Sequence, residues 1–175
     1  ATAVKTKAVT WSLYFNIAAN KNTLKALSDK ETVTEMVISR GDQSQILVVG
    51  GGAFDWYMPK WLGVDPDNGD PLWEDIIYDA EGNEIDRVAT NIYTDAAEDY
   101  QVMGSPFPDF AGGFGTFLSY KGLSLNATFS YSVGNMIYHS SRQESDNDGE
   151  NTSVNSMVLQ KGWSRWVNPG DVATH

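Results

Sequence analysis

The chain has 175 residues, 41% of them hydrophobic, and a formal net charge of −11. Because it has no cysteine, a disulfide framework and thiolate chemistry are excluded, and the acidic excess argues against a nucleic-acid partner, which would need a basic face. It also has no apolar run of about 18 residues, so it encodes no transmembrane helix.

The first predicted element is a long strand at residues 8–19. Every odd position from Val9 to Ala19 is apolar, whereas the even positions from Thr10 to Asn16 are Thr, Ser, Tyr and Asn, and this period of two is typical of a strand. The turn-forming residues 20–22 follow, and the apolar residues after them predict a returning strand at residues 23–29. We therefore expect a hairpin here.

Residues 30–109 are predicted to be rich in loops. They contain a triple glycine at residues 50–52, several prolines and little periodicity. The stretch from Asp65 to Asp99 holds twelve acidic residues and one basic residue, Arg87. A block this acidic is usually a solvated loop region.

The clearest predicted unit is a hairpin of strands at residues 113–121 and 123–135. A two-residue turn at Lys121–Gly122 pairs Tyr120 with Leu123. The same register gives further pairs along one largely apolar face: Leu118 with Leu125, Thr116 with Ala127, and Phe114 with Phe129. The opposite face of the second strand carries only small uncharged residues: Ser124, Asn126, Thr128, Ser130, Ser132 and Gly134.

Two fold classes explain this alternation. A soluble β-sandwich is the commoner source of alternating strands, and it would make the chain a secreted or surface glycan-binding module without transport activity. Both clear runs here, however, reach the roughly nine to eleven residues that a membrane-spanning strand needs, and their polar faces lack charge. We therefore favour an all-β fold, a segment of an antiparallel transmembrane β-barrel with long extracellular loops.

In such a barrel, short turns face the periplasm and long loops face outward. The turns Lys21–Asn22 and Lys121–Gly122 are accordingly expected on the periplasmic side. Residues 30–109 and a second polar segment at about 140–156 are expected to be extracellular. The whole chain, residues 1–175, would belong to one barrel domain.

Candidate ligand-contact residues are aromatic and lie in the predicted outer loop. Trp56, Tyr57, Trp61 and Trp73 could stack on sugar rings or peptide side chains, or they could dock a partner protein. The alternative is a purely structural role, in which these side chains pack within the loop or lie at the membrane interface. No residues suggest a catalytic site, since the two histidines are far apart and no triad spacing is present, so the chain is predicted not to be an enzyme.

Calcium is the one metal that the acidic loops suggest. Asp65, Asp67 and Asp70 offer several carboxylates within six residues, which is the chemistry that calcium prefers. The glycine at position 69 falls one place too early for an EF-hand loop, and no Glu stands at the twelfth position. Solvated turns rich in Asp, Asn and Gly are the better explanation, so we expect no cofactor.

Several stretches resemble the SusC/RagA-like TonB-dependent outer-membrane transporters, and their order matches the later part of that family's barrel. These stretches are Phe15–Asn22, Gly63–Leu72, Gly104–Gly115, Tyr120–Asn135 and Trp166–Asp171. The family's plug domain, TonB box, early strands and closing strand find no counterpart here. The resemblance therefore implies an internal fragment from the C-terminal part of a barrel.

The resemblance also implies a function for the intact protein. It would be an importer in the outer membrane of a Gram-negative bacterium, taking up oligosaccharides or peptides under a SusD-like surface lipoprotein. TonB would supply the energy through parts of the protein outside this chain. On this basis we expect the present residues to supply barrel wall against the lipid bilayer, together with outer loops.

Overall fold

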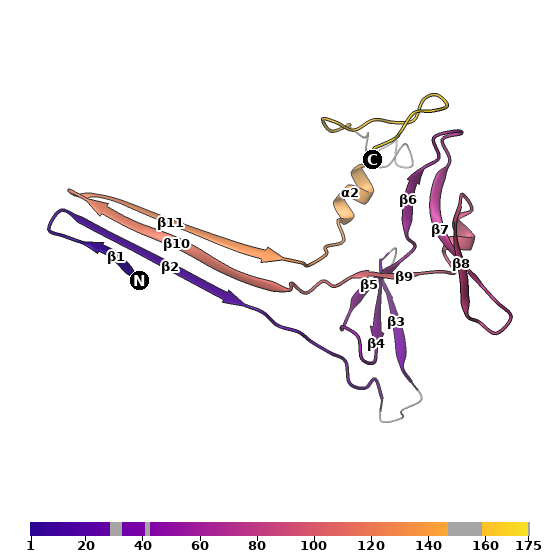
Figure 1. Ribbon diagram of the computed structural model, residues 1–175, viewed down its shortest axis with the longest axis horizontal. Helices are drawn as coiled ribbons and strands as arrows, with labels where there is room; N and C mark the ends of the chain where they lie inside the picture. The colour runs from indigo at the N-terminus through magenta and orange to yellow at the C-terminus, as the bar shows by residue number, and fades with distance from the viewer. Residues whose placement is uncertain (29–32, 41–42, 147–158, 175) are drawn as a thin grey trace. The chain divides into compact units, whose positions relative to one another are not determined.

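Figure 1 shows the computed structural model, which describes residues 1–28, 33–40, 43–146 and 159–174. Its elements in chain order are β1 (Thr2–Lys5), β2 (Val9–Ala18), β3 (Glu35–Arg40), β4 (Gln43–Val48), β5 (Asp55–Met58), β6 (Trp61–Val64), β7 (Pro71–Tyr78), β8 (Glu84–Thr90), α1 (Tyr93–Ala96), β9 (Gln101–Gly104), β10 (Phe110–Tyr120), β11 (Leu123–Val133) and α2 (Ser140–Ser145). Neither α1 nor α2 has the length and apolar character of a membrane-crossing helix.

The strands form three open sheets, so the described residues do not close into a barrel. The sheets have the orders β1-β2-β10-β11, β3-β4-β5-β9 and β6-β7-β8. The pairings within the first and third sheets are antiparallel. The all-β, antiparallel part of the predicted fold class is therefore confirmed, whereas the assignment of the described sheets to a segment of a transmembrane barrel stays a prediction.

The chain divides into two compact units, and each is described by itself. The first consists of residues 1–36, 47–55 and 104–136, and the second of residues 37–46, 56–103 and 137–175. The β1-β2-β10-β11 sheet, here called the long sheet, belongs to the first unit. The β6-β7-β8 sheet belongs to the second.

The predicted hairpin at residues 113–121 and 123–135 is confirmed with its register. Tyr120 lies opposite Leu123, and Phe114 lies opposite Phe129. β10 starts at Phe110, three residues earlier than predicted, because both neighbouring strands extend the ladder: Phe110 lies opposite Val133 of β11, and β2 pairs with β10 from Ala111 onward. Both strands of the hairpin have 11 residues.

The predicted strand at residues 8–19 is confirmed as β2, but its predicted hairpin with residues 23–29 is wrong. The described part of that segment is not a strand. Instead, the Leu24 N–H donates to the Gly51 carbonyl at 3.0 Å, and the Leu24 carbonyl accepts from the Gly50 N–H at 2.8 Å. The segment is thus held by the glycine turn after β4, while β2 pairs with β1 and β10.

The predicted orientation of the two short turns needs a correction for the same reason. At one end of the β2–β10 ladder Val9 lies opposite Tyr120, and at the other end Ala18 lies opposite Ala111. Lys121–Gly122 follows the first end, whereas Lys21–Asn22 follows the second. The two turns therefore cannot share one side of a membrane crossed by this sheet.

Residues 30–109 are more ordered than the sequence suggests, because they contain the seven strands β3 to β9. These strands have four to eight residues, and their sequences do not alternate strictly: β7, for example, reads PLWEDIIY and so lacks the period of two that marks a strand. The β7–β8 hairpin closes through Asp79, whose carboxylate accepts from the Asn83 N–H at 2.7 Å. In the predicted outer loop at 140–156, residues 140–145 form α2, and residues 147–156 lie outside the described residues.

Candidate functional site

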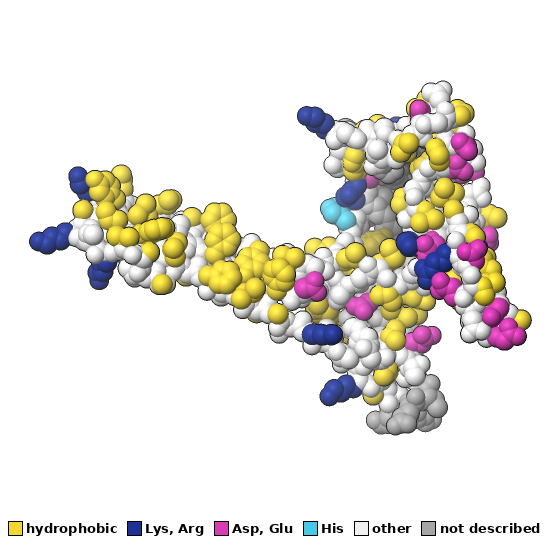
Figure 2. Space-filling view, in the orientation of Figure 1, with side chains coloured by type: hydrophobic (Ala, Val, Ile, Leu, Met, Phe, Trp, Pro, Cys, Tyr) yellow, Lys and Arg dark blue, Asp and Glu magenta, His cyan; other side chains and the backbone are white. Residues whose placement is uncertain are grey.

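The long sheet has one face of large, exposed apolar side chains, here called the apolar face. The register places Phe15, Phe114 and Phe129 in one row across β2, β10 and β11. Phe15 is 65% exposed and Phe129 is 54% exposed. The other large members of this face are Val4, Val9, Trp11, Leu13, Ile17, Phe110, Leu118, Tyr120, Leu123, Leu125, Tyr131 and Val133. Figure 2 shows hydrophobic side chains along this sheet.

Two polar groups on the apolar face are hydrogen-bonded within the sheet. The Trp11 indole Nε1–H donates to the Thr116 hydroxyl at 2.8 Å. The Tyr131 hydroxyl donates to the Asn16 carbonyl at 3.1 Å. Such pairing matters in hydrocarbon, where an unpaired polar group costs several kcal/mol, about as much as a lost hydrogen bond with no water to replace it.

Two glycines of β10 let tyrosines from the neighbouring strands lie across it. A Cβ at Gly115 would stand 2.5 Å from Cε1 of Tyr14, whose hydroxyl reaches the Thr128 hydroxyl on β11. On the apolar face, a Cβ at Gly112 would stand 2.6 Å from the Tyr131 hydroxyl. The glycines thus permit side chains to connect strands that are not adjacent.

The opposite face of the long sheet is lined mostly by small polar side chains, and its one charged side chain is that of Lys5, which lies opposite Thr10 at the end of β1. On β11 these are Ser124, Asn126, Thr128, Ser130 and Ser132. Asn16 of β2 lies on the same face, and its side-chain oxygen accepts from the Gly113 N–H at 2.6 Å. Phe117 and Tyr14 are the large side chains there. Apart from Lys5 at one end, this face can line a polar space without placing a charge in it.

The structure separates the four aromatic residues that the sequence singles out. Trp61 and Trp73 are adjacent, with ring centroids 5.5 Å apart, and Tyr93 joins them at 5.3 Å from Trp73. Trp56 instead contacts Tyr138, and Tyr57 contacts Tyr100. They form three aromatic groups, and ligand contact by any of them stays a prediction.

A residue that the sequence reasoning did not single out as a site completes a cavity beside Trp61. Trp166 lies over Gly69, and its Nε1–H donates to the Pro66 carbonyl at 2.8 Å. Together with Arg165 these side chains line a cavity of about 490 Å³ in the second unit. The only sign of this contact in the sequence is Gly69, which has a φ of +83° and lacks the side chain that would clash with the indole.

The carboxylates of two calcium candidates, Asp65 and Asp70, already accept hydrogen bonds from other groups. The Asp65 carboxylate accepts from the Asp67 N–H at 2.8 Å, and the Asp70 carboxylate accepts from Asn68 at 3.0 Å and from Asn91 at 2.7 Å. Over the described residues, no group of three or more His, Cys, Asp or Glu side chains is placed to hold a metal ion. The expectation that these loops hold no cofactor stays a prediction.

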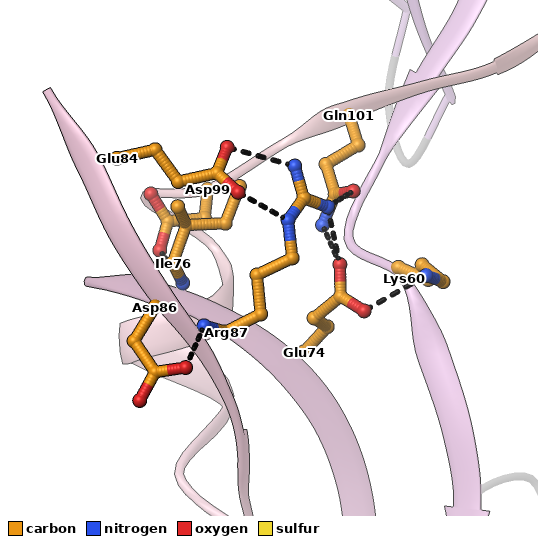
Figure 3. Close-up of polar contacts among 8 residues, drawn as sticks. All are labelled: Lys60, Glu74, Ile76, Glu84, Asp86, Arg87, Asp99 and Gln101. Carbon is orange, nitrogen blue, oxygen red and sulfur yellow. Dashed lines mark hydrogen bonds and ion pairs between the residues drawn. The ribbon is translucent and has the colours of Figure 1, made fainter. Parts of the chain in front are cut away.

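The β6-β7-β8 sheet carries a charged cluster around Glu74, a buried residue of β7 (Figure 3). Its carboxylate accepts from Lys60 at 2.8 Å, from Arg87 at 2.7 Å and from Gln101 at 2.9 Å. The Lys60 hydrogen bond, with those from Gln101 and Arg87, lowers the pKa of Glu74 to about 2 in spite of burial. Arg87 also forms two hydrogen bonds with Glu84.

The next residue along β7 behaves in the opposite way. Burial raises the pKa of Asp75, and the neighbouring Asp99 carboxylate raises it further. Asp99 also accepts from the Ile76 N–H at 2.7 Å and so ties the end of the α1 segment to β7. Both clusters hold the second unit together, and neither places a nucleophile beside a base.

Comparisons with known proteins agree on one kind of protein. No family model matches the chain. Two TonB-dependent receptors of Formosa agariphila are similar to it, one 24% identical over 98% of the chain and 19% of the receptor, the other 27% identical over 89% of the chain and 16% of the receptor. The chain thus spans less than a fifth of the length of these curated relatives.

Solved structures show the same likeness in fold. The RagAB peptide transporter matches with a TM-score of 0.70 at 23% identity, over 99% of this chain and 19% of that one. The RagAB peptide importer in its closed-closed state matches with a TM-score of 0.68, at 23% identity over the same shares of the two chains. These relatives are receptors and transporters, which confirms the prediction that the chain is not an enzyme.

Proposed function

We propose that this chain, a segment similar to the SusC/RagA-like TonB-dependent receptors, forms part of the wall of a nutrient importer in the outer membrane of a Gram-negative bacterium. The observation that carries the proposal is the long sheet. One of its faces is apolar and exposed, and the other is polar, with no charged side chain except Lys5 at one end. The first face would lie against lipid, and the second would line the lumen.

The strands have the length that this role requires. At roughly 3.3 Å per residue, the 11 residues of β10 span about 36 Å, and a tilt of about 45° reduces this to a height of about 25 Å. That height matches the apolar band of outer-membrane barrels, which is about 25 Å tall.

The alternative, a glycan-binding β-sandwich, fits the sheet less well. A sandwich buries the inner face of each sheet against a second sheet. In the long sheet the candidate inner face is exposed, with Leu125 57% and Ile17 58% accessible. An apolar surface of this extent needs an apolar environment, and a lipid bilayer provides one.

Fluorophore labelling at alternate positions of β11 tests the assignment of faces, and the chain has no native cysteine to interfere. Single cysteines would replace Leu125 or Phe129 on the apolar face, and Asn126 or Ser130 on the polar face, in the full-length protein reconstituted into bilayers. A nitroxide quencher attached to the lipid chains should quench labels at 125 and 129 but not those at 126 and 130. Equal quenching at all four positions would refute the proposal.

For the cargo and partners we propose peptides or oligosaccharides taken up with a SusD-like lipoprotein and driven by TonB. The RagAB neighbours are named as a peptide transporter and importer, which supports peptides. The cavity that Trp61 and Trp166 line gives the second unit a surface that could stack on an apolar or ring-shaped ligand. Replacing both tryptophans with alanine should reduce growth on the transported nutrient as sole source, while a control variant at an exposed tyrosine outside the cavity, Tyr78→Ala, should not.

A further inference from the structure

A hollow of about 530 Å³, here called the acidic hollow, lies at one end of the long sheet. Its lining residues belong to the first unit, and they include Ala19, which follows β2, and Asp109, which precedes β10. The chain leaves the sheet here after Ala18 and returns to it at Phe110. Ligand pockets have volumes of roughly 300–1,000 Å³, so the acidic hollow has room for part of a small ligand.

The Asp55 carboxylate lines the acidic hollow without a partner for its buried oxygen. Within the part of the chain that the structure describes, its Oδ1 atom is buried and has no hydrogen-bond partner. Gly52 makes room for the carboxylate, since a Cβ there would stand 2.7 Å from each of its two oxygens. A buried acceptor that is left unpaired is costly, and more so when it is charged. Such an atom therefore indicates a missing ion or ligand.

Asp109 brings a second carboxylate to the acidic hollow from the polar face of the long sheet. Its N–H donates to the Val133 carbonyl at 2.9 Å, which continues the β10–β11 ladder beyond β10. Its side chain lies over Gly134, where a Cβ would stand 2.6 Å from the Asp109 Cγ. Asp109 and Gly134 continue the face of Ala111 and Ser132, which lie opposite each other in the register. The acidic hollow therefore opens on the polar face.

The other lining residues favour a singly charged organic cation over a metal ion. Lys21 also lines the acidic hollow, so the two carboxylates and its ammonium leave a formal net charge of −1, which one more ammonium group would neutralise. Asn20 and Ser105, whose side chains carry acceptor oxygens, are lining residues too. A primary ammonium has three hydrogens to donate to such acceptors. No group of three or more His, Cys, Asp or Glu in the described ranges is placed to hold a metal ion.

The rest of the long sheet makes this end distinct in charge. Residues 1–18 and 110–133 contain no Asp or Glu, and their only charged side chains are those of Lys5, Lys7 and Lys121. Lys5 ends β1, Lys7 precedes β2 and Lys121 follows β10, so all three lie at the end away from the acidic hollow. A cation near the polar face is therefore attracted to the end with the two carboxylates and repelled from the other.

We propose that the acidic hollow binds a primary ammonium group of the cargo, with the Asp55 and Asp109 carboxylates accepting its hydrogen bonds. The ammonium supplies the partner that the buried Asp55 carboxylate lacks. The inference rests on the proposed function, because it takes the polar face as lining the lumen. It adds the chemistry that this end of the lumen selects: an amine-bearing peptide or an amino sugar is retained, and the same molecule without its positive charge is not.

The test measures binding to the full-length protein in nanodiscs by isothermal titration calorimetry. One pair of probes is a glycine–lysine–glycine tripeptide with blocked ends and its Nε-acetyl-lysine form. The other pair is a trisaccharide of glucosamine and its N-acetylated form. Acetylation removes the positive charge in both pairs. At least one ammonium probe should bind about ten-fold more tightly than its acetylated form, and the pair that shows this preference identifies the source of the amine.

Substitutions assign the preference to the acidic hollow. Asp55→Asn should abolish it, and Asp109→Asn, at an exposed position, should lower it by about three-fold. Because Asp109 is exposed, its variant keeps the test valid if Asp55→Asn does not fold. Lys21→Gln should strengthen binding of the ammonium probe by about two-fold, since it removes a like charge. The matched control, Glu35→Gln, removes an exposed carboxylate of the same unit that does not line the hollow and should keep the preference.

Four outcomes would overturn the proposal. They are equal binding of the ammonium and acetylated forms in both pairs, an unchanged preference in both aspartate variants, an equal loss in Glu35→Gln, and binding of calcium ions at micromolar concentration that Asp55→Asn abolishes, which would make the hollow a metal site. Lipid-chain quenching of a label at Leu125 is measured in the same nanodiscs. Quenching without an ammonium preference refutes only the cargo site, whereas absent quenching refutes the assignment of the polar face to the lumen.

Discussion

Gly115→Ala is expected to destabilise the folded protein by about 1–3 kcal/mol through the side chain of Tyr14. The new Cβ would lie 2.5 Å from Cε1 of Tyr14, whereas carbon atoms in contact are separated by about 3.5–4.0 Å. The ring must therefore move by roughly 1 Å. It then loses its hydrogen bond to the Thr128 hydroxyl, which costs about 1 kcal/mol of folding free energy. Crowding of the ring costs about 1–3 kcal/mol more. Alanine also lowers the conformational entropy of the unfolded chain, which stabilises the folded protein by about 0.5–1 kcal/mol.

The assay is a urea titration of the full-length protein in detergent micelles, followed by heat-modifiable gel migration. The matched background is Tyr14→Ala, in which the space above Gly115 is empty. There, Gly115→Ala should be neutral or stabilising by up to about 1 kcal/mol. Tyr14→Phe isolates the hydrogen bond and should cost about 1 kcal/mol. If Gly115→Ala costs the same with and without the Tyr14 ring, the explanation of this glycine is wrong.

Two further predictions concern polar groups in the two units. Because the pKa of Glu74 is lowered to about 2 from 4.5, its ion pairs contribute stability above about pH 4.5 that is lost as the pH falls towards 2. The contribution is about 1 kcal/mol, since its partners are partly exposed, and Glu74→Gln should flatten the pH dependence of urea midpoints followed by tryptophan fluorescence. Thr116→Val should cost about 1–3 kcal/mol in the same titration by leaving the Trp11 indole N–H unpaired on the apolar face, whereas Thr10→Val should cost less.

The long sheet could be predicted because two local signals agree there. The alternation in β10 and β11 assigns each residue to a face, and a two-residue turn at Lys121–Gly122 leaves only one register that keeps the apolar side chains together. Gly122, with a φ of +87°, and Lys121, with a φ of +45°, have the positive values that such a turn requires. A slip of one residue would place Ser124 among the aromatic rings.

The partners of β2 could not be predicted, because they depend on contacts distant in the sequence. The turn-forming residues after Ala19 suggested a local hairpin, yet Asn22 uses its side-chain oxygen to accept from the Ala53 N–H at 2.9 Å. That contact joins residues 31 positions apart. An asparagine side chain such as that of Asn22 favours a local turn, but it can equally well hold together two loops that are distant in the sequence.

The candidate aromatic site was only partly predictable for a similar reason. Composition identifies exposed tryptophans and tyrosines, but not which of them meet. Trp61 and Trp73 face each other because β6 and β7 pair in that register, and Trp166 joins their neighbourhood from more than 90 residues away. The Glu74 cluster could not be predicted, because Glu74 lies in an acidic block that is expected to be solvated throughout. Arg87, the single basic residue of that block, is the only residue there whose type indicates an ion pair.

The pairing of β2 with β10 has a consequence for how this protein can change over evolution. The chain leaves the sheet after Ala18 and returns to it at Phe110, so everything between them starts and ends at two neighbouring strands. Doubling the length of such an excursion adds only about 0.6 kcal/mol to the entropy cost of closing it. Insertions, deletions or a wholesale exchange of those residues can therefore accumulate in different lineages, while the register of the wall is inherited unchanged.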